Sequence, residues 1–322
     1  MAKKQRKIII ANPMYDIVFK TLMMTNKEFA RYFVETIIGV KITEIDFAPQ
    51  EYTYERKKET NNQVVIIKVI RLDFVATIRT KDGNLKRVLI EIQQSHKPID
   101  VLRFCTYLGK QYIQSALEAT EEEGEGEEDE EKEDKDVKAL PIISIYMLGY
   151  NMPTNPHIAV KVDRVGKNLL GGERVELNDP LMETLTHEAY FIQVARIKEV
   201  MYENWETCSE LLKLLSLFEQ SNFIEEKHYK KYKYPKTNNK TLEKMIRTLE
   251  RIAADAYIKR IMEEQDFDEL EVNLLQKTIE SLQSNNTALQ SNNLALQSNN
   301  TALQIQLAEY QRRFGNLNFA TI

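Results

Sequence analysis

Residues 63–94 read QVVIIKVIRLDFVATIRTKDGNLKRVLIEIQQ, and this stretch dominates the prediction of the fold. Residues 63–79 are rich in β-branched side chains, which favour extended strands. The Lys81-Asp82-Gly83-Asn84 segment that follows is typical of a hairpin turn. Residues 85–94 then supply a return strand, so the stretch predicts a β-hairpin.

Helical and extended segments surround this hairpin. Apolar residues recur at helical spacing over residues 14–38, and Gly39 supplies a stop signal. Residues 98–118 predict an amphipathic helix whose apolar stripe is Val101, Leu102, Cys105, Leu108, Tyr112, Ile113 and Leu117. Extended stretches are expected at residues 40–55, 141–148, 157–164 and 186–196. This order predicts an α/β fold with a mixed sheet flanked by helices.

The C-terminal part of the chain is expected to be helical and to end in a coiled coil. Residues 199–266 have helical periodicity, and a heptad array follows from residue 267 to 322. The d positions are Leu275, Leu282, Leu289, Leu296, Leu303 and Tyr310, and the a positions are Val272, Ile279, Asn286, Asn293, Asn300, Leu307 and Phe314. Leucine at d with asparagine at a favours a parallel homodimer through residues 268–314. A long solvated helix, or one packed on its own domain, is the alternative.

Composition points to a cytoplasmic protein with no membrane association. The net charge is −5, but residues 121–136 hold twelve acids against two lysines, so the rest of the chain carries about +5. That surplus permits nucleic-acid binding without demonstrating it. No apolar run reaches membrane-spanning length, no signal peptide is visible, and the two cysteines lack disulfide or metal spacing.

The acidic run interrupts the pattern of a folded domain. It has no apolar residue, so we expect a disordered insertion at residues 120–138. It is interpreted as a solvated loop, with mimicry of DNA as a minor alternative. The expected domains are therefore residues 1–198 with this insertion, the helical region 199–266 and the coiled coil 267–322.

Asp73 and Glu91 are acidic residues inside apolar strand segments. A buried acid is costly unless it is paired or binds a metal. If the turn has two residues, the numbers of paired residues sum to 165 and the two acids lie on opposite faces. A three-residue loop at 81–83, or one bulge, makes the sum 164 and places the acids directly opposite each other. The residues alone leave both registers open.

In the second register, Asp73 and Glu91 form a candidate catalytic metal site. A divalent cation would relieve the repulsion between the two carboxylates, and oxygen ligands suit Mg²⁺ or Mn²⁺. Gln93 lies two residues beyond Glu91 and so on the same face, where it would orient a water molecule. A hard metal beside a water-positioning group is the minimum for phosphodiester hydrolysis.

These residues carry a family resemblance. Asp73 followed by Glu91-Ile-Gln93 resembles the Asp…Glu-x-Lys signature of the PD-(D/E)XK nuclease superfamily in a Glu-x-Gln variant. The Asp16-Ile-Val-Phe19-Lys20 and Arg103-Phe-Cys-Thr-Tyr107 segments are similar to those of the PD-(D/E)XK nuclease family transposases, or recombination-promoting nucleases. The similarity covers roughly residues 12–200 and, more loosely, the helices to about 265.

The resemblance implies a restriction-endonuclease-like core and a Mg²⁺-dependent DNA endonuclease in DNA recombination. It implies catalytic roles for Asp73, Glu91 and Gln93, with the metal on the two carboxylates. Because Gln93 replaces the superfamily's lysine, a positive charge is lost and slower activity is implied. The acidic insertion lies outside the family pattern.

Four residues are candidates for supporting roles. Asp16 and Lys20 would contact the site or form an ordinary helical ion pair. Arg103 and Tyr107, one helical turn apart, would contact a phosphate or pin their helix to the acidic site. The sequence does not choose between these alternatives.

A lysine–tyrosine segment and two rival functions complete the predictions. Residues 227–236 interleave five lysines with three tyrosines, which suits nucleic-acid contact, although a solvated interhelical loop has the same composition. The first rival function is a catalytically inactive nuclease fold that binds DNA or a protein and dimerises through the coiled coil. The second is a coiled-coil adaptor without metal affinity.

Overall fold

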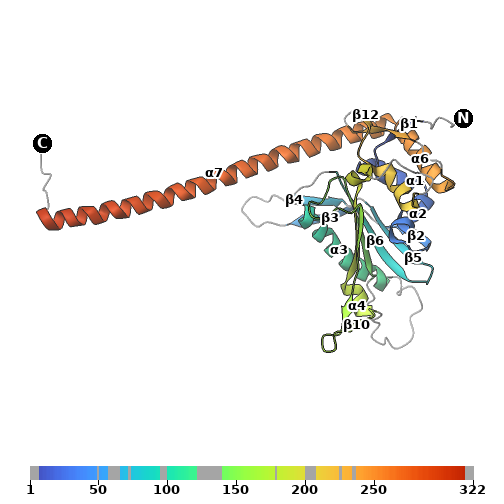
Figure 1. The fold of residues 1–322 in the computed structure, drawn as a ribbon, viewed down its shortest axis with the longest axis horizontal. Coiled ribbons are helices and arrows are strands. Elements are labelled where there is room, and N and C mark those ends of the chain that lie inside the picture. Colours follow the sequence, from blue (N-terminus) through green and yellow to red (C-terminus); the bar gives the residue numbers. More distant parts are fainter. Residues whose placement is uncertain are drawn as a thin grey trace. The chain divides into compact units, whose positions relative to one another are not determined.

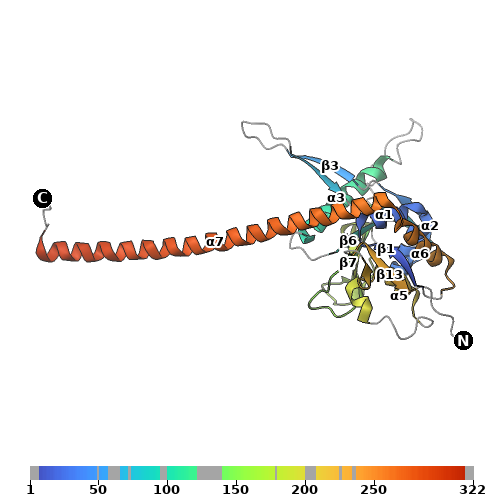
Figure 2. The same ribbon diagram turned by 90° about the horizontal axis from the view of Figure 1, so that it is seen from above.

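The computed structural model describes residues 7–48, 51–56, 66–71, 74–94, 100–121, 140–177, 180–199, 208–224, 227–233 and 237–315. Contacts divide the chain into two compact units, Met1–Met262 and Glu263–Ile322. The first unit is a mixed α/β domain, whose sheet and helices are visible in Figures 1 and 2. Within the described ranges, no helix has both the length and the apolar character needed to cross a bilayer.

A six-stranded mixed sheet forms the centre of the first unit. Its strand order is β2-β5-β6-β7-β11-β8. The bounds are β2 Ile42–Phe47, β5 Phe74–Thr80, β6 Leu85–Gln93, β7 Ile142–Leu148, β8 Ala159–Val162 and β11 His187–Gln193. β6, β7 and β11 run parallel, and the remaining pairs are antiparallel. The expected α/β class with a mixed sheet is therefore confirmed.

The hairpin of β5 and β6 settles the register that the sequence left open. Paired residues sum to 164, from Phe74 with Ile90 to Arg79 with Leu85. The Thr80 amide donates to the Asn84 carbonyl at 2.9 Å, which leaves residues 81–83 as a three-residue loop. Gly83 has a φ of +86°, a left-handed conformation that glycine adopts without strain.

The described residues of the β-rich run 63–79 form strands β4 and β5. β4 (Ile66–Arg71) pairs with β3 (Glu51–Arg56) in a separate two-stranded sheet. β5 belongs to the six-stranded sheet. Residues 72 and 73, between the two strands, lie outside the described residues.

The helix expected over residues 14–38 is two helices, α1 (Asp16–Thr25) and α2 (Lys27–Ile38). Asn26 separates them in an extended conformation, and its side chain accepts a hydrogen bond from the Glu28 amide. An asparagine at this position satisfies an otherwise unpaired helical donor, so the second helix begins there. Gly39, with a φ of +73°, ends α2 as the sequence indicates.

Helices cover both faces of the sheet. On one face, α1 and α2 pack with α5 (Glu210–Leu215), η2 (Ser216–Phe218) and α6 (Lys240–Ile252) in the main core. Phe19 of α1 is central to this core, where its ring contacts those of Phe33, Phe74 and Phe218. The core therefore joins segments that lie about 200 residues apart in the sequence.

The opposite face is covered by α3 (Asp100–Glu121). Val75, Leu89 and Ile142 of the sheet pack against Tyr107, Leu108 and Tyr112 of the helix. The apolar stripe expected on this helix is partly wrong, since Leu102 and Ile113 are each 67% exposed and Cys105 is exposed. The face of α3 that packs on the sheet instead consists of Arg103, Phe104, Tyr107, Leu108 and Gln111. Polar side chains are therefore part of the interface between the helix and the sheet.

The region 199–266, expected to be helical, also contributes strands. β13 (Tyr229–Lys233) pairs with β1 (Lys7–Ala11) and with β12 (Phe223–Ile224) in a three-stranded sheet. The smaller elements of the unit are η1 (Val194–Glu199), α4 (Pro180–Leu185), β9 (Gly166–Lys167) and β10 (Arg174–Val175). One of the two pairing partners of β13, strand β1, is more than 200 residues away, so this pairing does not follow from local periodicity.

α7 (Ala256–Phe314) is a single helix of 59 residues and accounts for the described part of the second unit. It carries the heptad array, in agreement with the expected C-terminal helix. Of the expected acidic insertion, residues 120 and 121 belong to α3, and residues 122–139 lie outside the described residues.

Candidate functional site

One face of β6 carries three polar side chains beneath α3. Strand alternation places Arg87, Leu89, Glu91 and Gln93 on the same side, and Leu89 packs in the cluster that includes residues of α3. Arg87, Glu91 and Gln93 are buried, with 1%, 5% and 6% of their surfaces exposed. Burial of two charged residues and an amide on one strand face indicates a polar centre, because such groups are costly to bury without partners.

The neighbouring strand β7 adds Ser144 and Tyr146 to this centre. Tyr146 is the direct partner of Glu91 in the parallel register, and Ser144 is the partner of Leu89. Burial raises the pKa of the Tyr146 hydroxyl, the nearby Ser144 side chain opposes that rise, and the Glu91 carboxylate adds to it. The Tyr146 ring stacks on Phe191 at 4.9 Å between centroids and lies 5.0 Å from Phe104, so the phenol is held in place as a neutral group.

α3 contributes a guanidinium group that contacts the candidate catalytic amide. The Arg103 Nη2 atom donates a hydrogen bond to Gln93 Oε1. The guanidinium also lies 5.3 Å from the centroid of the Phe104 ring and 5.8 Å from that of Tyr107. Of the two roles predicted for Arg103 and Tyr107, attachment of the helix to the site is the one visible in these contacts. It also brings a positive charge next to Gln93.

Asp16 and Lys20 form the ion pair that their spacing predicts. Lys20 Nζ lies 2.9 Å from Asp16 Oδ2. The start of α1 is also tied to the end of β6, because Gln94 Nε2 donates to the Met14 carbonyl at 3.1 Å. Asp16, the first residue of α1, is therefore held close to the end of the strand that carries Glu91 and Gln93.

Asp73, the remaining predicted catalytic residue, lies outside the described residues. Among the residues with described positions, no group of three histidine, cysteine, aspartate or glutamate side chains is placed to hold a metal. Glu91 offers one carboxylate, which is a suitable but incomplete ligand set for a hard divalent cation.

Sequence reasoning missed three polar members of the site, namely Arg87, Ser144 and Tyr146. Arg87 could have been predicted from the sequence. It lies an even number of residues from Glu91 and Gln93 in one strand, which places all three side chains on one face. Ser144 and Tyr146 alternate within the apolar run of β7, but their proximity to Glu91 depends on the pairing of β6 with β7.

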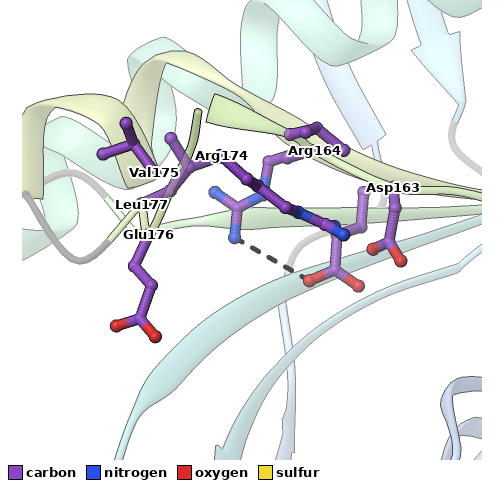
Figure 3. A pocket seen from close by; sticks show the side chains of 8 residues that line it. Asp163, Arg164, Arg174, Val175, Glu176 and Leu177 are labelled. Carbon is purple, nitrogen blue, oxygen red and sulfur yellow. Dashed lines mark ion pairs between the residues drawn. The ribbon is translucent and has the colours of Figure 1, made fainter. Parts of the chain in front are cut away.

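A separate hollow of about 480 Å³ lies around β8, β9 and β10 and is lined by both charge signs. Figure 3 shows Arg164, Arg174 and Asp163 near one another, whereas the Glu176 side chain points away from them. Arg164 donates to the Glu183 carbonyl and the Thr186 hydroxyl and lies 3.8 Å from Glu188. Lys161, beside the hollow, hydrogen-bonds to Asp163 and lowers the pKa of that carboxyl. Because these charged side chains pair with one another, the hollow has no excess of positive charge to attract a phosphate and no excess of negative charge to attract a cation.

The lysine–tyrosine segment is a packed strand rather than a loop or an exposed stacking platform. Tyr229, Lys230 and Tyr232 of β13 are buried, with at most 7% of each surface exposed. The Lys230 amino group is buried and donates hydrogen bonds to two backbone carbonyls, whereas Lys227 and Lys231 are exposed. The solvated-loop interpretation is therefore wrong for Tyr229–Lys233, whereas phosphate contact through the exposed lysines stays a prediction. Residues 234–236 lie outside those described.

No protein-family model matches the chain, and no match is found among curated proteins or solved structures.

Proposed function

We propose that the protein is a Mg²⁺-dependent DNA endonuclease of the PD-(D/E)XK type. The observation that carries the proposal is the β5–β6 register, in which paired residues sum to 164. This is the register for which the sequence predicts Asp73 opposite Glu91. Glu91 and Gln93 occupy the same polar face of β6.

Each residue has a distinct role in this proposal. The carboxylates of Asp73 and Glu91 would hold Mg²⁺ or Mn²⁺, with water completing the ligand set. The bound cation would supply Lewis acidity and a lowered pKa for a coordinated water molecule. Gln93 would orient a water molecule, and Arg103 fixes the Gln93 amide through its hydrogen bond.

Arg103 also compensates for the absence of lysine at position 93. Its guanidinium lies within hydrogen-bonding distance of Gln93, so a permanent positive charge is available beside the amide. Outside the acidic run, the chain carries the positive surplus of about +5, which favours contact with a phosphate backbone. These features support DNA as the substrate.

A plasmid-nicking assay in Mg²⁺ or Mn²⁺ tests the proposal. We expect Asp73→Ala, Glu91→Gln and metal chelation each to reduce nicking at least about 100-fold, and Arg103→Ala to reduce it about 10- to 100-fold. Glu44→Gln is the matched control, since Glu44 is an exposed carboxylate on β2 of the same sheet. Nicking that survives Asp73→Ala and Glu91→Gln would place the active site elsewhere.

A second candidate function is a binding module with an inactive nuclease fold. The specific observation in its favour is the burial of Glu91 and Gln93 beneath α3, which leaves 5% and 6% of their surfaces exposed. Calorimetric titration with Mn²⁺ separates the two functions. Heat that disappears in Glu91→Gln supports the enzyme, whereas DNA binding without metal binding or nicking supports the module.

A further inference from the structure

The described part of α7 beyond Met262 has an apolar seam with no partner inside its own unit. The seam consists of the d residues Leu275, Leu282, Leu289, Leu296, Leu303 and Tyr310 and the apolar a residues Ile279, Leu307 and Phe314. Their surfaces are between 48% and 69% exposed. The second unit contains this one helix among its described residues, so nothing else in the unit packs on the seam. Leucines in a regular heptad seam are stabilised when a second helix covers them.

The centre of the seam carries three asparagines, which restrict the kind of partner. Asn286, Asn293 and Asn300 occupy three successive a positions between Ile279 and Leu307. An apolar partner would bury these amides without hydrogen bonds, which is unfavourable. A helix with asparagine at the same layers would allow each amide to bond to its counterpart.

Charge does not select the partner in this region. No Asp, Glu, Lys or Arg occurs between Ser281 and Ala308. Ion pairs between flanking positions, which usually set partner and orientation in coiled coils, are therefore unavailable to these four heptads. The asparagine pattern is the feature left to determine orientation and register.

We propose that α7 is an interface for a second copy of this chain, paired in parallel and in register by the three asparagine layers. In an antiparallel pair, a positions face d positions, so all three asparagines would oppose leucines. A parallel pair shifted by one heptad keeps two asparagine layers and places the other amides against Ile279 and Leu307. The unshifted parallel pair alone matches all three layers. β-branched Ile279 at a with leucine at d further favours two strands.

Disulfide trapping in the full chain tests orientation and register together. In a background of Cys105→Ser and Cys208→Ser, Ile279→Cys places one thiol in an a layer. Unshifted parallel pairing brings the two thiols within disulfide distance, whereas a one-heptad shift separates them by about 10 Å along the axis. An antiparallel pair separates them by about 40 Å. Ser284→Cys is the control, because it lies at an f position that points away from the seam.

We expect at least about ten-fold more covalent dimer with Ile279→Cys than with Ser284→Cys, and a light-scattering mass of two chains for the unmodified protein. Replacing all three asparagines with leucine is expected to remove register selection, so that a chain carrying Leu282→Cys cross-links to a chain carrying Leu289→Cys, two d positions one heptad apart. A monomeric mass would overturn the proposal, as would equal cross-linking of Ile279→Cys and Ser284→Cys. Preferred linkage between positions 282 and 289 with the asparagines intact would also overturn it. None of these readouts depends on nuclease activity.

Discussion

Lys230 is a buried lysine whose replacement should change how stability depends on pH. It lies on β13 with 1% of its surface exposed, and its Nζ atom donates to the Ser216 carbonyl at 3.2 Å and the Glu219 carbonyl at 2.8 Å. Burial lowers the pKa of the amine to about 7, although the nearby Glu219 carboxylate favours the charged form. A neutral amine retains two N–H bonds, which is enough for both carbonyls.

The pKa difference sets the size of the effect. An unfolded lysine has a pKa of 10.5, so between about pH 7 and 10.5 the unfolded chain binds up to one more proton than the folded chain. The free energy of unfolding therefore rises with pH in this window, by about 1.4 kcal/mol per pH unit. From pH 7.5 to 9.5 the contribution of Lys230 is about 2.5 kcal/mol. Below pH 7 both states are protonated, so the destabilisation by the buried charge is complete.

Urea unfolding of the wild type and Lys230→Met at pH 7.5 and 9.5, followed by circular dichroism, measures this contribution. We expect the wild type to gain about 2.5 kcal/mol more than Lys230→Met between the two pH values, because other titrating groups are shared. Lys231→Met is the matched control, since the neighbouring side chain on β13 is exposed, and it should behave like the wild type. An equal pH dependence in wild type and Lys230→Met would show that the lysine is charged throughout and refute the reasoning.

Three further substitutions test the packing of the first unit. A Cβ atom at Gly149 would lie 2.5 Å from the Gln94 carbonyl oxygen, so Gly149→Ala should lower the free energy of unfolding by about 1–3 kcal/mol. Gly109→Ala, in the interior of α3 with no atom within 4 Å of the new Cβ, should instead raise it by up to about 1 kcal/mol. A higher melting temperature for Gly149→Ala than for Gly109→Ala would contradict both the close approach at Gly149 and the open space at Gly109. Phe19→Ala should cost about 3–5 kcal/mol in urea unfolding, because Phe19 is fully buried among aromatic rings, and a loss below about 1 kcal/mol would mean that this core is not packed as described.

Much of the local structure follows from the sequence. The hairpin turn predicts β6, the apolar run 141–148 predicts β7, helical periodicity predicts α3, and Gly39 predicts the end of α2. These features depend on side chains within a few residues of one another, so they can be predicted without knowing which distant segments pack against them. The position of Gln93 on the same strand face as Glu91 belongs to this class, because successive strand residues alternate between faces.

The tertiary structure decided the features that depend on distant partners. The sum of 164 in the hairpin depends on a three-residue loop, which the turn residues do not distinguish from a two-residue loop. The burial of Lys230 within β13 depends on pairing with β1, more than 200 residues away in the chain. Composition indicates that a side chain suits a strand or a helix, but what covers it is determined by contacts between segments far apart in the chain. For this reason the sequence by itself proposed Glu91 and Gln93, whereas only the folded chain joined them to Arg103, Ser144 and Tyr146.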